Sequence, residues 1–267
     1  RSISHYEDGA YVACCSYGET DFFGYSSSYY TPYGSRYANG GVSAVAKIPT
    51  YTYTTDADGN ATITGFNGGF ASISIPATID GHPVVAIGDN AFKSVQDCSV
   101  KITDLAAWCA IEFGNENSNP LKGQRTVYDI GCETTYYSSL YVNGVFASSI
   151  VIPQNVTSIG AYAFYGYRKL SSITFSGNVK EIGEDAFTYC GVESIYIEDL
   201  AAWCSIDFAN ADANPMNREV DLYIQGVKCT HIVIPSGITS IADWAFYNSS
   251  ITSVTIPEGV TRIGSGS

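Results

Sequence analysis

Five segments of this sequence repeat one pattern, and this repetition limits the folds available to the chain more than any other feature. They are IPATIDGHPVVAIGDNAF (75–92), IPQNVTSIGAYAF (152–164), FSGNVKEIGEDAF (175–187), IPSGITSIADWAF (234–246) and the shorter IPEGVTRIG (256–264). The second and third start 23 residues apart, and the fourth starts 22 residues before the fifth. A unit of this length cannot bury its apolar edge alone, whereas stacked units cover one another. The pattern therefore predicts a solenoid.

Prolines and glycines mark the ends of the elements within each unit. An alternating stretch such as SSIVI or TSVTI ends at a proline (Pro76, Pro153, Pro235 and Pro257), as expected of a strand that stops donating to a ladder. A glycine follows the second apolar run (Gly88, Gly160, Gly183 and Gly264), where we expect the backbone to turn with a positive φ. Ala242 takes that place in one unit, so the requirement is tolerant or that turn is strained.

A longer module occurs twice, as DLAAWCAIEFGNENSNPL (104–121) and DLAAWCSIDFANADANPM (199–216). Asp104 and Asp199 precede Leu-Ala-Ala-Trp as N-caps precede a short helix, and the NP dipeptides indicate turns. Each module leads to an LYVNG or LYIQG element and then to an IVIP unit. Between Pro120 and Leu140 the first copy has 13 residues more than the second, which predicts a loop on one face of the stack.

These repeats resemble the BspA-type leucine-rich repeats of bacterial and protozoan cell-surface and secreted proteins. The resemblance covers about residues 50–264, and YTYTTDADGNATITGF (51–66) looks like the hairpin that opens such arrays. It implies a mostly β fold with short helices or 3₁₀ turns, in which short parallel strands form a curved leucine-rich-repeat solenoid. It also implies adhesion or protein binding without catalysis. The expected domains are a Tyr/Gly/Ser-rich segment, 1–50, and a solenoid, 51–267, that ends in mid-repeat.

Charge and composition exclude several functions. The 13 basic and 26 acidic residues give a net charge of −13, which repels nucleic acid and anionic membranes. No run of 18 apolar residues predicts a membrane span. The 21 tyrosines, 26 glycines and single methionine are typical of secreted or cell-surface β proteins. Because the chain starts at Arg1 and ends inside a repeat, we expect a processed piece of a longer protein.

The Trp-Cys pairs raise the question of catalysis. A nucleophilic cysteine needs a nearby base, and none of His5, His82 and His231 occupies an equivalent place in both modules. We therefore predict no catalytic residue, and a set of core residues instead: Trp108, Cys109, Phe164, Phe187, Trp203, Cys204 and Phe246. Two disulfide pairings stay open from spacing, Cys109 with Cys132 and Cys204 with Cys229.

Acidic groups in the sequence suggest no metal or cofactor. DADGN (56–60) has the first three ligand spacings of a calcium loop. Ala61 stands where that loop needs glycine, and the final glutamate is missing, so a hairpin turn is the preferred interpretation. Glu181, Glu184 and Asp185 could suggest glycoside hydrolysis, but they fall at variable positions of the repeat and indicate a solvated face.

Ten of the 21 tyrosines lie before residue 54. Their segment is predicted to cap the first coil, to present a binding surface for protein or glycan, or to add as a strand to another copy. The binding residues proposed from it are Phe22, Phe23, Tyr25, Tyr29, Tyr30, Tyr33 and Tyr37. The sequence as a whole predicts a non-catalytic adhesion protein that binds a protein or glycan of a cell or matrix surface along its strand-lined face. The alternative is a structural subunit that assembles end to end into a filament or surface layer.

Overall fold

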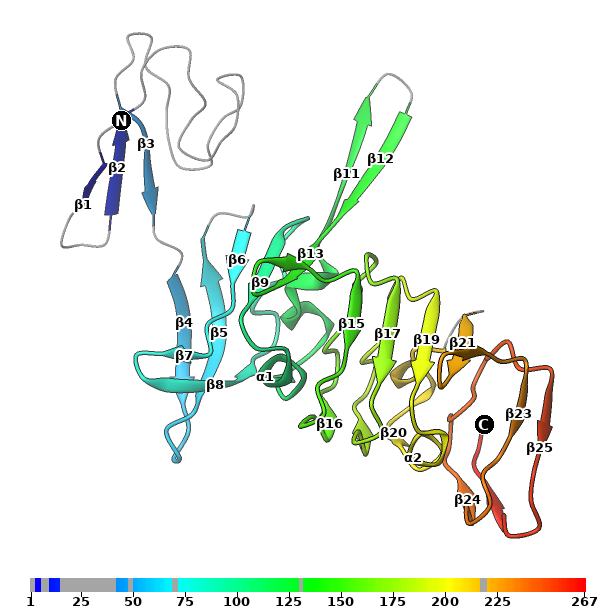
Figure 1. Cartoon of the computed structure of the whole chain (residues 1–267). Helices are drawn as coiled ribbons and strands as arrows, with labels where there is room; N and C mark the ends of the chain where they lie inside the picture. The colour runs from blue at the N-terminus through cyan, green and yellow to red at the C-terminus, as the bar shows by residue number, and fades with distance from the viewer. Residues whose placement is uncertain are drawn as a thin grey trace.

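The computed structural model describes residues 3–5, 10–14, 42–47, 50–68, 72–129, 132–216 and 220–267 (Figure 1). In the first 49 residues the described parts are three strands of one antiparallel sheet, β1 (Ile3–His5), β2 (Ala10–Cys14) and β3 (Val42–Lys47). From residue 50 onward the chain is mostly β and winds into a solenoid of parallel strands, which confirms the predicted fold class.

An antiparallel hairpin opens the solenoid, as the sequence predicts. It consists of β4 (Thr50–Thr55) and β5 (Ala61–Asn67). Its turn is closed by Asp56, whose carboxylate accepts from the backbone N–H groups of Asp58 and Asn60 at 3.0 and 2.8 Å. The side-chain amide of Asn60 donates to the same carboxylate at 3.0 Å, and this bond, with the backbone bonds, lowers the pKa of Asp56. The DADGN segment is thus a hairpin turn.

Three parallel ladders join successive coils, and the first runs through the strand that begins each unit. Its strands fall into three sheets. They are β6 (Ser72–Ser74), β9 (Ser99–Ile102) and β13 (Ser139–Val142); β15 (Ser149–Val151), β17 (Ser172–Phe175), β19 (Ser194–Ile197) and β21 (Asp221–Ile224); and β23 (His231–Val233) with β25 (Ser253–Thr255).

The second ladder runs through the short strands that follow each proline turn or, in the long modules, the short helix. They are β8 (His82–Ile87) with β10 (Glu112–Phe113); β16 (Ser158–Ile159), β18 (Glu181–Ile182) and β20 (Asp207–Phe208); and β24 (Ser240–Ile241) with β26 (Arg262–Ile263). The extra residues of the first unit form β7 (Thr78–Ile79), which pairs antiparallel with β8.

The third ladder joins the turns that carry the AYAF-type sequences. Tyr162 and Phe164 donate backbone N–H groups to the carbonyls of Glu184 and Ala186 in the next coil, both at 2.9 Å. The residues that point inward stack in rows from coil to coil. Ile150, Ile173, Ile195 and Leu222 are buried in register, and the rings of Phe164 and Phe187 stack with centroids 5.3 Å apart.

The expectation for the repeat glycines is wrong. Positive φ occurs at the third residue after the isoleucine, as in Tyr162 (59°) and Trp244 (63°), and not at Gly160 or Gly183. A Cβ at Gly160 would instead lie 2.2 Å from the carbonyl oxygen of Ile111 in the preceding coil. The glycine is needed because two backbones approach closely there.

Each long module starts with a short helix capped as predicted. The helices are α1 (Leu105–Cys109) and α2 (Leu200–Trp203). Asp104 accepts from the N–H groups of Ala106 and Ala107 at 2.8 and 3.2 Å, and Asp199 makes the same pair of bonds. Short 3₁₀ turns follow: η1 (Glu116–Ser118) and η2 (Pro120–Lys122) in the first module, η3 (Ala211–Ala213) in the second.

Both modules end in a two-residue hairpin turn that adds an antiparallel strand. β13 turns through Asn143 and Gly144 into β14 (Val145–Phe146), and β21 turns through Gln225 and Gly226 into β22 (Val227–Lys228). All four turn residues have positive φ, as a type I′ turn requires. The 13-residue excess of the first module lies in a further hairpin, β11 (Gln124–Asp129) and β12 (Cys132–Tyr137), which projects from the stack in Figure 1.

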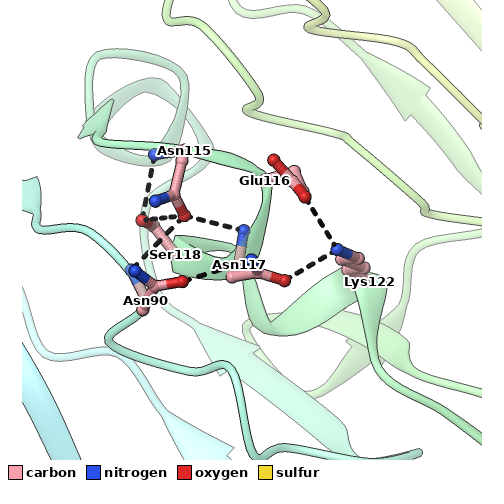
Figure 2. A network of polar contacts seen from close by, with 6 residues as sticks. All are labelled: Asn90, Asn115, Glu116, Asn117, Ser118 and Lys122. Atoms are coloured by element: carbon pink, nitrogen blue, oxygen red, sulfur yellow. Dashed lines mark hydrogen bonds and ion pairs between the residues drawn. The ribbon is translucent and has the colours of Figure 1, made fainter.

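A polar network supports the third ladder at the first module (Figure 2). The side chain of Asn115 caps η1 and accepts at 3.3 Å from the backbone N–H of Asn90, a residue with φ of 59°. Asn117 donates to the Asn90 side chain at 3.2 Å and accepts from Lys122 at 2.7 Å. Lys122 also pairs with Glu116 at 3.3 Å. The network thus holds a left-handed residue of one coil against the next.

Candidate functional site

The Trp-Cys pairs lie in the core and tie coils together. Trp108 donates its indole N–H to the carbonyl of Ala163 at 3.0 Å, and the buried Asn119 amide donates to the same oxygen at 2.8 Å. We call this arrangement the first clamp. The second clamp repeats it 95 residues later, with Trp203 and Asn214 donating to Ala245 at 2.8 and 3.1 Å. Both NP dipeptides therefore supply an inward-pointing amide as well as a turn.

The other predicted core residues are buried, with one partial exception. Cys109, Cys204, Phe164 and Phe187 are fully buried. Phe246 packs against the core but is only partly buried.

The module thiols are poor nucleophiles. Burial, with a smaller contribution from the aspartate N-cap, raises the pKa of Cys109 to about 12 and that of Cys204 to about 11. Both sulfurs therefore stay protonated at neutral pH, and only the thiolate attacks. This chemistry fits packing rather than covalent catalysis.

Neither of the two pairings left open for the cysteines forms in this structure. Cys109, Cys132, Cys204 and Cys229 are all free thiols. Cys109 and Cys204 are enclosed in the core, whereas Cys132 is exposed on the projecting hairpin and Cys229 donates to the carbonyl of Val227. The buried thiols of Cys109 and Cys204 thus pack against apolar side chains of the core.

The aromatic residues predicted to bind from the N-terminal segment lie outside the described residues. They are Phe22, Phe23, Tyr25, Tyr29, Tyr30, Tyr33 and Tyr37. That prediction stays a prediction.

The structure instead brings aromatic and cationic side chains together on the solvent side of the first ladder. Lys101 of β9 lies beside Tyr141 of β13, and Tyr141 lies beside Phe146 of β14, all three in register. The ring centroids of Tyr141 and Phe146 are 5.7 Å apart. Their strand neighbours Val100 and Leu140 point into the core, so the first triplet (Lys101, Tyr141 and Phe146) faces outward.

A second triplet at the second module likewise has two aromatic residues and one lysine, with the lysine at the opposite end of the row. Tyr196 of β19 lies beside Tyr223 of β21, and Tyr223 lies beside Lys228 of β22. The two tyrosine rings stack with centroids 4.6 Å apart and planes 17° from parallel. Lys228 pairs with Asp221 at 2.7 Å, and this hydrogen bond raises the pKa of the lysine, which keeps its charge.

Hydroxyl groups line the same face. The strands of the first ladder begin with serine in seven cases, at Ser72, Ser99, Ser139, Ser149, Ser172, Ser194 and Ser253. Ser172 donates to Ser149 at 2.7 Å, and Lys169 donates to Ser139 at 2.7 Å. Rings, ammonium groups and hydroxyls together can bind a ligand through apolar contact, charge and hydrogen bonds.

Sequence reasoning named the strand-lined face but missed both triplets. The signal was present, because LYVNGVF and LYIQGVK place the tyrosine and the residue after the turn at equivalent positions. The parallel partners, Lys101 and Tyr196, come from other units and become neighbours only once the register is known.

Two hollows lie in the part of the chain that the structure describes. One of about 20 Å³ lies between the first helix and the turn after β6, and holds little more than a water molecule. Another, of about 420 Å³, lies at the last coil and is lined by side chains that include Ile241, Phe246 and Ile251. Among the described residues, no group of three His, Cys, Asp or Glu side chains is placed to hold a metal ion.

The parallel ladders and stacked apolar rows define a leucine-rich-repeat solenoid. Residues 134–210 and 222–267 match the BspA type leucine rich repeat region in six copies, which confirms the predicted resemblance over those residues. No curated protein matches the sequence. Within the described ranges, both α-helices are too short to cross a bilayer.

Solved bacterial proteins of the same repeat class are similar to this chain. The leucine-rich repeat protein of T. pallidum is 17% identical over 80% of this chain and 83% of its own, with a TM-score of 0.41. A leucine-rich cell surface protein of Faecalibacterium prausnitzii is 24% identical over 82% and 45%, with a TM-score of 0.29. A leucine-rich repeat protein of Eubacterium ventriosum is 16% identical over 82% and 62%, with a TM-score of 0.28. The last two alignments span less than two thirds of the solved proteins.

Proposed function

We propose that this protein is a non-catalytic binding or adhesion protein, secreted or held at a cell surface, that engages a protein or glycan ligand through the face carrying the two triplets. The supporting observation is that the same combination of two aromatic rings and one lysine recurs in register in both long modules. Aromatic side chains give large contact area at low entropic cost, and they dominate the energetics of interfaces.

Two equivalent patches on one rigid stack also favour an extended ligand. When a ligand is bound at one triplet, its contact with the other is an intramolecular event. Its overall affinity therefore exceeds that for either triplet alone. The serine row between them supplies hydrogen-bonding groups along the way. Filamentous proteins and long glycans of a matrix fit such a surface.

Protein and glycan arrays probed with purified chain test this function. We expect ligands bound by the unmodified protein to lose at least about tenfold in affinity when Tyr196 and Tyr223 are both changed to alanine, and again when Tyr141 and Phe146 are. Tyr189→Ala is the matched control, because Tyr189 is also an exposed aromatic residue but lies in the turn after Phe187 and not on a strand of the first ladder. Equal loss in the control, or no loss in either double variant, contradicts the proposal.

The second candidate function is a structural subunit that assembles end to end. The feature that favours it is the Tyr/Gly/Ser-rich segment, 1–50, because strands of this composition can add to the exposed edge of a sheet. In this scheme the tyrosine-rich segment of one copy covers the last coil of another. Light scattering and electron microscopy distinguish the two functions, because concentration-dependent linear assemblies support the subunit and a persistent monomer supports the binder.

A further inference from the structure

The hairpin β11–β12 is an addition that the solenoid does not need for its own fold. The first module reaches β13 only after this hairpin, whereas the second passes from Pro215 to β21 with 13 fewer residues. The flanking contacts are nevertheless the same: Leu121 and Met216 donate their N–H groups to Asn119 and Asn214 at 2.9 and 2.8 Å. The second module is therefore a natural version of the first without the hairpin.

Both edges of this hairpin are open. β11 and β12 pair only with each other among the described strands, over six residue pairs with no register shift. Most of their residues are exposed, including Tyr128 at 76%. Sheet edges are protected by prolines, bulges or charged side chains, lysine above all. Neither strand has a proline, a lysine or a bulge, and their charged residues are Arg125, Asp129 and Glu133. A two-stranded ribbon of threonine, valine and tyrosine is marginal by itself and gains from a third strand.

The base of the hairpin is fixed, while its outer part keeps uncompensated charge. Arg125 makes two bonds to Asp97, at 2.7 and 3.3 Å, and its guanidinium lies 4.8 Å from the ring centre of Tyr136. Asp129 and Glu133, near the turn, are exposed and form no ion pair with any described residue. The part of the hairpin that reaches farthest from the base is thus acidic.

We propose that β11–β12 is a docking site for an extended, lysine- or arginine-bearing segment of a partner polypeptide, which adds to the hairpin as a third strand. Backbone hydrogen bonds along the free edge of either strand supply affinity, and Asp129 and Glu133 select positive charge. The net charge of −13 favours the same partner. A second copy of this chain is disfavoured, since pairing two hairpins would bring four carboxylates and two acidic chains together.

The test uses labelled synthetic heptapeptides of alternating threonine and lysine, measured by fluorescence anisotropy at low and physiological salt. Three comparison peptides are the glutamate counterpart, a version N-methylated at alternate residues, and one with proline at its centre. We expect the lysine peptide to bind the full chain at least about tenfold more tightly than each of the others, because only it has both the charge and the backbone donors.

Two protein variants locate the site. In the first, residues 122–138 are replaced by residues 217–220 of the second module, which removes the hairpin while keeping the junctions that this chain already uses. In the second, Asp129→Lys with Glu133→Lys reverses the charge on an intact hairpin. Both should lose lysine-peptide binding by at least about tenfold. If the first variant fails to fold by circular dichroism, the second still decides the question.

Binding of the lysine peptide that survives in the charge-reversed variant, or equal binding of the glutamate peptide, overturns the proposal. So does sedimentation of the full chain as a dimer that the hairpin replacement abolishes, because the edge would then serve a second copy. The paired variant Tyr196→Ala with Tyr223→Ala must leave peptide binding unchanged. This separates failure of the hairpin site from failure of the triplet face.

Discussion

Trp203 donates its indole N–H to the carbonyl oxygen of Ala245 over 2.8 Å, across 42 residues of sequence. Trp108 makes the same bond to Ala163, and in each case an asparagine amide shares the acceptor. Because Ala163 and Ala245 follow residues with positive φ, the clamps fix carbonyls that a strained turn would otherwise leave buried without a partner. Each clamp therefore stabilises a contact between coils.

The clamp asparagines should be costly to remove. Asn119→Ala takes donors from the carbonyls of Tyr162 and Ala163 and an acceptor from the Leu121 N–H. We expect a loss of about 2–3 kcal/mol in the free energy of unfolding, measured by urea denaturation. The control is Asn178→Ala, which removes an exposed amide-to-carbonyl bond between coils and should cost less than about 0.5 kcal/mol. Equal costs would mean that the clamp adds nothing beyond an ordinary surface bond.

Gly160 should tolerate no side chain. An alanine Cβ there would meet the carbonyl oxygen of Ile111 at 2.2 Å, so one coil must move. Gly160→Ala should lower the free energy of unfolding by more than about 2 kcal/mol. Gly259→Ala is the control, because its Cβ would lie 3.7 Å from the nearest atom and its φ is ordinary. Thermal melting of both variants checks this, and a small effect at Gly160 would show that the coils separate easily.

The stacked tyrosines of the second triplet should couple energetically. Tyr196→Ala and Tyr223→Ala each remove a half-buried ring, and a double-mutant cycle should give a coupling of about 0.5–1 kcal/mol for the stack. Thr174, beside Tyr196 in the same row, should couple less strongly. Zero coupling between the tyrosines would argue that their stacking is incidental.

Stability should fall at alkaline pH because of the buried thiols. The folded-state pKa of Cys109, about 12, lies above the ordinary value of 9.0, so folding favours the protonated thiol. Its contribution is complete below pH 9 and is lost as pH rises from 9 to about 12. Between pH 8 and 10 the wild type should lose about 1 kcal/mol more than Cys109→Ala. Urea unfolding at each pH measures this, and parallel slopes would contradict it.

Exposure should decide which thiols react. At neutral pH a maleimide should label Cys132 in the folded chain, whereas Cys98, Cys109 and Cys204 should react only after denaturation. Peptide mapping by mass spectrometry distinguishes the sites. Rapid labelling of Cys109 under native conditions would show that the core opens far more often than its packing implies.

Much of the structure of each coil could be predicted because the pattern of apolar residues recurs in every unit. The apolar spacing of IPQNVTSIGAYAF predicts which residues point inward, and Asp104 and Asp199 predict the short helices as their N-cap residues. The role of Gly160 could not be predicted, since a tight turn and a close approach of two backbones require the same residue. Only the position of Ile111 in space distinguishes them.

The site was harder to predict because it is assembled from residues far apart in sequence. Tyr196 and Tyr223 are adjacent only through the parallel register of β19 and β21. Likewise, Asn119 reads locally as a turn residue, and its amide contacts are made with residues more than 40 positions away. The 13-residue excess predicted a loop that leaves the stack. The antiparallel pairing of β11 with β12 within that loop was not predicted.

Within the described coils, the hydrogen bonds join each coil to its nearest neighbours, so the stack can change length by whole units. Between the two clamps, gaining or losing one whole unit would move the second triplet along the stack by a single strand spacing, about 4.8 Å, and would leave every other interface as it was. The distance between the two patches is thus adjustable in fixed increments by gene duplication. A lineage could match that separation to a new ligand without redesigning a single contact.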